Sequence, residues 1–107
     1  MDIMKTSLIA LAIACQLCSG IAYMNSGDYD SALNQFGTII VNSPDSQFCD
    51  DAMYYSVLCY LAKNDKESAK ATYQKLIDKF PNSEYRQMAD QIMNEASGAT
   101  SEKSLEK

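Results

Sequence analysis

The chain has 107 residues, of which 47% are hydrophobic, so it can bury the core of one small domain. Its net charge is −5, and residues 1–60 hold all of the surplus, with six acidic residues and one basic residue. An acidic surface repels phosphate, so nucleic acid is not an expected partner. The acidic half either steers a basic partner toward this part of the chain or is simply a solvated face.

Enzymatic chemistry has little basis in this sequence. Histidine, the commonest general acid or base, is absent. The sequence has no glycine-rich phosphate loop and no nucleophile motif. The one close acidic pair, Asp50 and Asp51, opens a predicted helix, where acidic side chains favour the positive end of the helix dipole. We therefore predict a protein that is not an enzyme and that uses no cofactor.

The N-terminal segment has two interpretations. Residues 7–24 carry no charge, and Lys5 is the last basic residue before Lys63, a pattern typical of a secretory signal or a membrane segment. The sequence Ala12-Ile13-Ala14-Cys15 also resembles a lipoprotein processing site, which makes Cys15 a candidate for lipidation. The same stretch equally fits a buried first helix. Residues 1–12 are thus a signal, an anchor or the start of that helix, and the location is periplasmic, membrane-anchored or cytoplasmic.

One pattern occurs twice in the chain, 37 residues apart. In the first copy its members are Tyr23, Asp28, Ser31, Ala32, Phe36, Ile40, Pro44 and Ser46, and in the second copy they are Tyr60, Asp65, Ser68, Ala69, Tyr73, Ile77, Pro81 and Ser83. A period of this length indicates a supersecondary unit that buries its apolar face against a neighbouring copy.

Each copy predicts two helices joined by a turn. Asp28 and Asp65 can cap the second helix of each pair, and Pro44 and Pro81 end it. A third opening that starts at Ser83 predicts a terminal helix that covers the last repeat. The expected helices span residues 8–26, 29–42, 47–62, 66–80 and 83–96, and the polar residues 97–107 are expected to form a frayed tail.

These residues resemble a known family. The motifs Gly20-x-x-Tyr23, Gly27-Asp28-Tyr29-x-x-Ala32-x-x-x-Phe36 and Pro44 resemble the tetratricopeptide repeat (TPR), although Val57 and Asn64 replace both glycines in the second copy. The resemblance implies an all-α, antiparallel helix-turn-helix solenoid with repeats at 13–46 and 47–82 and a capping helix at 83–96. The sequence from Pro81 to Ala89 is similar to bacterial envelope repeat proteins, including outer-membrane assembly lipoproteins and the periplasmic coordinator of the Tol-Pal system.

The resemblance also implies a non-catalytic scaffold for protein–protein interaction. In the family, the first helix of each repeat lines the concave surface, which by position assigns partner contacts to Leu17, Ile21, Met24, Tyr54, Leu58 and Leu61. The expected partner is a protein or peptide with an apolar segment, and Tyr54 is the expected anchor. The alternative is that Leu17, Ile21 and Leu58 belong partly to the core. Residues 8–24 are apolar all round, which also fits membrane association, a homo-oligomer or a missing upstream repeat.

The four cysteines predict neither a metal site nor a disulfide. Cys15 and Cys18 have the spacing of a redox or metal pair, but the chain has no second such pair and no histidine. Cys49 and Cys59 fall on one predicted helix about 15 Å apart, too far for a disulfide. We expect these cysteines to act as small apolar residues. A small redox enzyme that uses Cys15 and Cys18 is the alternative from another functional class.

Overall fold

The computed structural model describes residues 2–97 of the chain, with side chains described for residues 11–95. The helices are α1 (Asp2–Asn25), α2 (Tyr29–Asn42), α3 (Cys49–Ala62), α4 (Lys66–Lys79) and α5 (Glu84–Ser97). No strand occurs within residues 2–97, so the predicted all-α fold is confirmed. The predicted tail lies, from residue 98 onward, outside the described residues.

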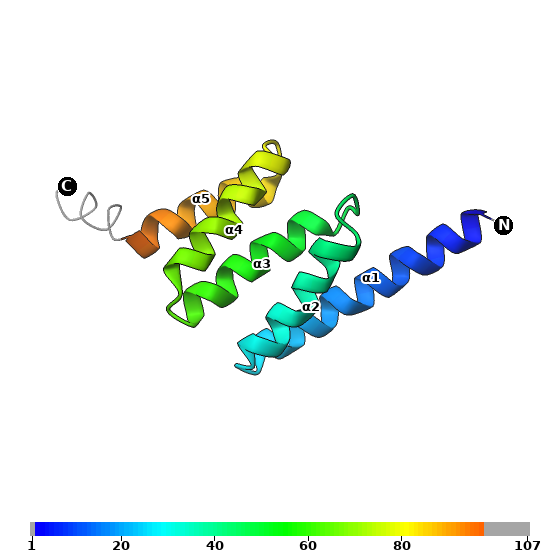
Figure 1. The fold of residues 1–107 in the computed structure, drawn as a ribbon, viewed down its shortest axis with the longest axis horizontal. Helices are drawn as coiled ribbons and strands as arrows, with labels where there is room; N and C mark the ends of the chain where they lie inside the picture. The colour runs from blue at the N-terminus through cyan, green and yellow to red at the C-terminus, as the bar shows by residue number, and fades with distance from the viewer. Residues whose placement is uncertain (1, 98–107) are drawn as a thin grey trace.

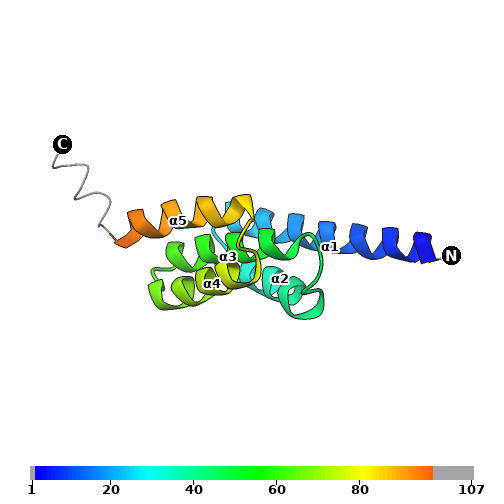
Figure 2. The ribbon, with the colours of Figure 1, turned by 90° about the horizontal axis from the view of Figure 1, so that it is seen from above.

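The helices form two layers, which are seen edge-on in Figure 2: α1, α3 and α5 form one layer, and α2 and α4 form the other. Consecutive helices run in opposite directions, as expected for helix pairs joined by short turns (Figure 1). The central helix is α3, which packs against α1, α2, α4 and α5. The N-terminal part of α1, dark blue in Figure 1, projects beyond the other helices.

The two helix pairs have equivalent turns. Asp28 accepts a hydrogen bond from the backbone N–H of Ser31 at 3.2 Å, and Asp65 accepts one from that of Ser68 at 3.2 Å. Gly27 has φ +90°, and Asn64, at the same place in the second pair, has φ +67°. Asparagine tolerates this left-handed conformation better than most residues do, so it can replace the turn glycine.

The other replaced glycine, Gly20, lies where α1 meets α2. A Cβ atom at Gly20 would lie 2.5 Å from Cε1 of Phe36, whose side chain is fully buried. The absence of a side chain at Gly20 therefore allows the Phe36 ring to pack directly against α1. In the second pair the equivalent residues are Val57, which is fully buried, and Tyr73, which is only partly buried and donates a hydrogen bond from its hydroxyl to Asp90.

The core has two parts that meet at α3. The first cluster joins the first helix pair to α3 and contains the buried residues Ile13, Leu17, Ala32, Phe36, Ile39, Ala52 and Cys59. The second cluster joins α3, α4 and α5 and contains the buried residues Cys49, Met53, Tyr54, Leu76 and Ala89. Because α5 contributes Ala89 and packs Tyr85 and Ile92 on this cluster, it covers the second pair, as predicted for a capping helix.

Helix α1 is longer than predicted. It is 24 residues long and continuous from Asp2, so the predicted extension up to residue 12 belongs to the same helix as the predicted start of the first repeat. Among the described residues, no helix has both the length and the apolar character needed to cross a membrane.

Candidate partner-binding surfaces

The six predicted contact residues form three equivalent pairs in the two repeats. Leu17 and Tyr54 are each 7% exposed. The other four residues, Ile21, Leu58, Met24 and Leu61, are partly buried. The matching degree of burial within each pair, buried for the first and partly buried for the other two, agrees with the 37-residue register. The partner-contact role of the four partly buried residues stays a prediction.

Leu17 and Tyr54 differ from the other four residues, since their side chains lie in the core rather than on an open surface. For Leu17 this burial agrees with the predicted alternative that it belongs partly to the core, whereas for Tyr54 it was not expected. Leu17 belongs to the first cluster and Tyr54 to the second. The Tyr54 ring packs against Tyr55 with ring centroids 5.4 Å apart and against Tyr85 of α5 with centroids 5.0 Å apart. Position within the repeat could not reveal this burial, because it depends on how α5 covers α3. Tyr54 is therefore unavailable as an anchor for a partner.

An apolar stripe runs along α1 on the side opposite its buried residues. We call this stripe the open face of α1, and its members are Leu11, Cys15, Cys18 and Ala22, all of them exposed. Their spacing of four, three and four residues places them on one side of a helix. Leu11 is 61% exposed, one of the largest values for an apolar side chain in the described part of the chain.

The second repeat indicates what the open face of α1 is built to contact. Thirty-seven residues further on, the equivalent positions are Phe48, which directly precedes α3, and Ala52, Tyr55 and Cys59 on α3. Ala52 and Cys59 are fully buried in the first cluster, and Phe48 and Tyr55 pack against that cluster. The Tyr55 ring stacks on Phe36 of α2 with centroids 5.7 Å apart. These positions in the second repeat thus pack against the preceding helix pair, whereas their equivalents on α1 are exposed.

An acidic corner lies where α3 and α5 begin. The Ser83 hydroxyl donates a hydrogen bond to Asp50 at 2.7 Å. Burial, a hydrogen bond to Asp50 and the negative charges of Asp50 and Glu84 raise the pKa of Asp51 to about 6. Burial, followed by the nearby Asp51 carboxylate, raises the pKa of Tyr85 to about 12. The corner is therefore a place where negative charge is poorly tolerated.

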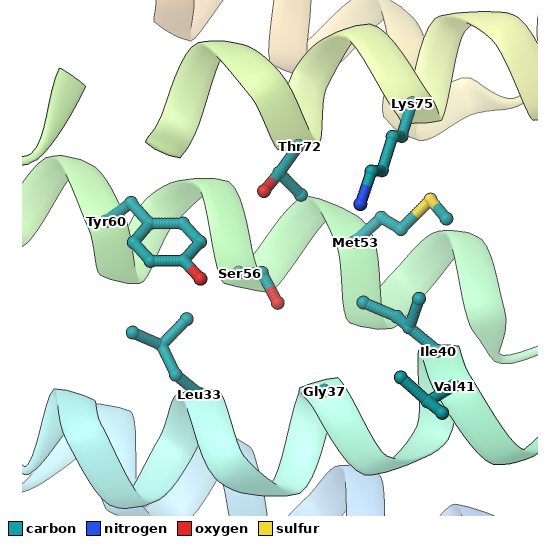
Figure 3. Close-up of a pocket in the computed structure, with 9 residues that line it drawn as sticks. All are labelled: Leu33, Gly37, Ile40, Val41, Met53, Ser56, Tyr60, Thr72 and Lys75. Atoms are coloured by element: carbon teal, nitrogen blue, oxygen red, sulfur yellow. The ribbon is translucent and has the colours of Figure 1, made fainter. Parts of the chain in front are cut away.

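A groove lies between α2 and α4, with α3 as its floor (Figure 3). Its volume is about 180 Å³, and it is lined by Leu33, Gly37, Ile40, Val41, Met53, Ser56, Tyr60, Thr72 and Lys75. A shallower hollow continues along α2 past Asn34, Thr38 and Asn42. A Cβ atom built at Gly37 would meet no atom within 4 Å. The 37-residue pattern does not mark this groove, which was not predicted from the sequence. The signal that could have revealed it is Gly37, a glycine inside a predicted helix and outside the repeat motif.

The cysteines divide by location. Cys15 and Cys18 are exposed, whereas Cys49 and Cys59 are buried, and all four are free thiols. Burial raises the pKa of Cys59 to about 11 and also raises the pKa of Cys49, so both buried thiols stay protonated at neutral pH. The described residues contain no group of three or more metal-ligating side chains.

Comparison with known proteins gave one result. Residues 51–83 match the family model described as tetratricopeptide repeat, a span that contains α4, the turn before it and nearly all of α3. Neither the curated proteins nor the solved structures gave a match. This match does not confirm the resemblance to the envelope lipoproteins, which stays a prediction. The match supports the tetratricopeptide repeat family for a chain whose described residues form an all-helical repeat stack.

Proposed function

We propose that the protein is a non-catalytic scaffold that binds another protein through the open face of α1. One observation carries this proposal: four apolar or small side chains are exposed on α1 at positions whose equivalents in the second repeat are buried in the first cluster or packed against it. Burial of apolar surface contributes about 25 cal/mol per Å². A helix that leaves such a stripe in water therefore gains stability when a partner covers it.

The repeat equivalence also describes the partner. The equivalent surface of α3 packs against α2, which contributes small and aromatic side chains, Ala32 and Phe36 among them. The expected partner therefore presents a helix with a small residue and an aromatic residue one turn apart. The partly buried Ile21 and Met24 lie near the C-terminal end of α1 and remain predicted contacts, as do Leu58 and Leu61 of α3.

Affinity purification from cells that produce the protein tests this proposal with two variants of the full chain. Leu11→Asp places a charge on the open face and should abolish recovery of the partner. Met88→Asp is the matched control, because Met88 is also an exposed apolar residue, at 43%, but lies on α5. Equal recovery of the same partner by wild type and Leu11→Asp would refute the assignment of the open face.

Self-association is a second candidate, and the spacing of the open face favours it. Leu11, Cys15, Cys18 and Ala22 follow the alternating three- and four-residue spacing of a coiled-coil seam. No charged residue occurs between Lys5 and Asp28, so two copies of α1 can meet without charge repulsion along this stretch. Light scattering should then give a mass that doubles with concentration for wild type but not for Leu11→Asp. A monomer at every concentration leaves only a different protein as the partner.

An envelope location is a further proposal, supported by the resemblance of residues 81–89 and by the candidate lipidation residue Cys15. It competes with the packing of α1, since processing before Cys15 would remove Ile13, a buried member of the first cluster. Mass spectrometry of the mature protein distinguishes a lipoprotein signal that is cleaved before Cys15 from an N-terminal segment that stays as part of α1. An acylated Cys15 would support the envelope location, and an N-terminus upstream of Ile13 would support the packed helix.

A further inference from the structure

The groove between α2 and α4 is independent of the open face of α1. It lies between the two helices of the other layer, and none of its lining residues belongs to α1 (Figures 2 and 3). Its volume of about 180 Å³ is below the roughly 300–1,000 Å³ of pockets for cofactors and drug-sized molecules. The space therefore suits one or two amino-acid side chains rather than a small-molecule ligand.

Gly37 has no explanation in the packing of the chain itself. It lies inside α2, where glycine is a poor helix former, and a Cβ atom there would meet only open space. Gly20 is different, since the Phe36 ring occupies the space where a side chain at Gly20 would lie. A glycine that leaves open space on a helix surface allows another backbone or side chain to approach closely. On either side of that space stand Leu33 and the highly exposed Val41.

Polar groups in the groove point to a ligand as well. Ser56 is only 3% exposed, and Figure 3 shows its hydroxyl directed into the groove. Within the part of the chain that the structure describes, the hydroxyls of Ser56, Tyr60 and Thr72 make no hydrogen bond. Among the described residues, the buried side-chain polar atom without a hydrogen-bond partner is Nε of Arg86, so the oxygens of these three hydroxyls are accessible to solvent in the groove. These hydroxyls are positioned to supply hydrogen bonds to polar atoms of an occupant.

The charge of the groove differs from that of the chain. The chain has a net charge of −5, but the residues that line the groove include one cation, Lys75, and no acidic residue. Figure 3 shows the Lys75 ammonium group directed from α4 toward the groove, and no salt bridge joins it to any other described residue. An occupant with a carboxylate would complement this charge.

We propose that this groove binds a peptide segment of another protein, which places one apolar side chain beside Gly37 and a carboxylate on Lys75. The apolar side chain contacts Leu33, Ile40 and Met53, and the unpaired hydroxyls of the groove bond the peptide's polar atoms. This site goes beyond the proposed scaffold function of α1, because it gives the protein a second surface for a second class of partner.

Selection of peptides on the full chain tests the proposal. The probe is a phage-displayed library of random dodecapeptides. The selected peptides are then synthesised, and their affinities for the full chain are measured. The selected peptides should share an apolar residue flanked by Asp or Glu. Gly37→Leu fills the groove and should weaken binding by about tenfold or more, and Lys75→Glu should do the same by reversing the charge. Added salt should weaken binding to wild type.

Two matched variants serve as controls. Gln74→Leu adds the same side chain at the equivalent exposed position of α4, and Lys70→Glu reverses another exposed charge on that helix. Both should bind the peptides like wild type, and Gly37→Leu should not lower the Tm, because its Cβ has room. The proposal is overturned if the selected peptides lack acidic residues or if Gly37→Leu binds them normally. It is also overturned if Leu11→Asp, on the open face of α1, is the variant that loses them.

Discussion

At the scale of single residues, the two helical glycines have opposite roles that the sequence alone does not reveal. Gly20 belongs to the TPR-like motif, and its packing against Phe36 explains physically why the motif has a glycine at this position. Gly37 has no place in the motif and faces open space. Helix propensity alone would rate both glycines as destabilising, because glycine is a poor helix former. Only the positions of neighbouring helices separate a required glycine from one that the fold does not need.

Alanine at each glycine gives a matched pair of predictions. Gly20→Ala should lower the free energy of unfolding by about 1–3 kcal/mol, since its Cβ overlaps the buried Phe36 ring. Gly37→Ala should raise the free energy of unfolding by about 0.5–1 kcal/mol, because alanine is the better helix former. Urea denaturation of both variants checks the signs. Tolerance of Gly20→Ala would show that the contact between Gly20 and Phe36 is misplaced, and destabilisation by Gly37→Ala would show that the space beside Gly37 is not open.

Asp51 predicts a pH dependence with a defined sign. Its pKa is raised in the folded state to about 6, so between its ordinary value of 3.8 and this value the folded chain binds more protons than the unfolded chain. The contribution of Asp51 to stability therefore falls as pH rises through this window. Asp51→Asn should stabilise the protein at about pH 7 more than at about pH 4, with a difference of about 1 kcal/mol after allowance for solvent screening.

Denaturation of wild type and Asp51→Asn at the two pH values provides the measurement. A supporting variant is Glu84→Gln, which removes a neighbouring negative charge and should lower the pKa of Asp51 in an NMR titration. A stabilisation by Asp51→Asn that is equal at both pH values, or larger in acid, would be incompatible with a raised pKa.

At the scale of helices, the sequence predicted most boundaries within two residues because caps and prolines mark them. Asp28 and Asp65 begin α2 and α4 by capping, and both helices end before a proline. Helix α1 is the exception, since it begins at Asp2 rather than near residue 8. No proline or glycine occurs before Gly20, so nothing in the sequence ends the helix upstream.

The buried alanines of α2 and α4 test how closely the helices pack. Ala32 and Ala69 are equivalent and fully buried, so Ala32→Leu and Ala69→Leu should each destabilise the fold by about 1–3 kcal/mol through overpacking. Ala71→Leu is the control, because Ala71 is exposed on α4. Thermal denaturation followed by circular dichroism compares the three variants. An equal Tm for all of them would argue against close packing at the alanines.

At the scale of the whole molecule, the repeat pattern predicted the stack but not the surfaces that the stack leaves uncovered. Burial of Tyr54 depends on α5, and exposure of the open face of α1 depends on the lack of a helix pair against it among the described residues. The groove depends on the spacing of α2 and α4. Each of these features belongs to contacts between helices, and a periodic pattern within one helix does not determine them.

Alkylation of the four cysteines, followed by mass spectrometry, tests the central claim most directly. Cys15 and Cys18 lie on the open face of α1, while Cys49 and Cys59 are buried and act as internal controls. In dilute purified protein, Cys15 and Cys18 should react much faster than the buried pair. They should become protected in cell extract or at high protein concentration, and Leu11→Asp should remove that protection. Equal reactivity of Cys15 and Cys18 in dilute protein, concentrated protein and extract would contradict the account, since the open face would then have no partner.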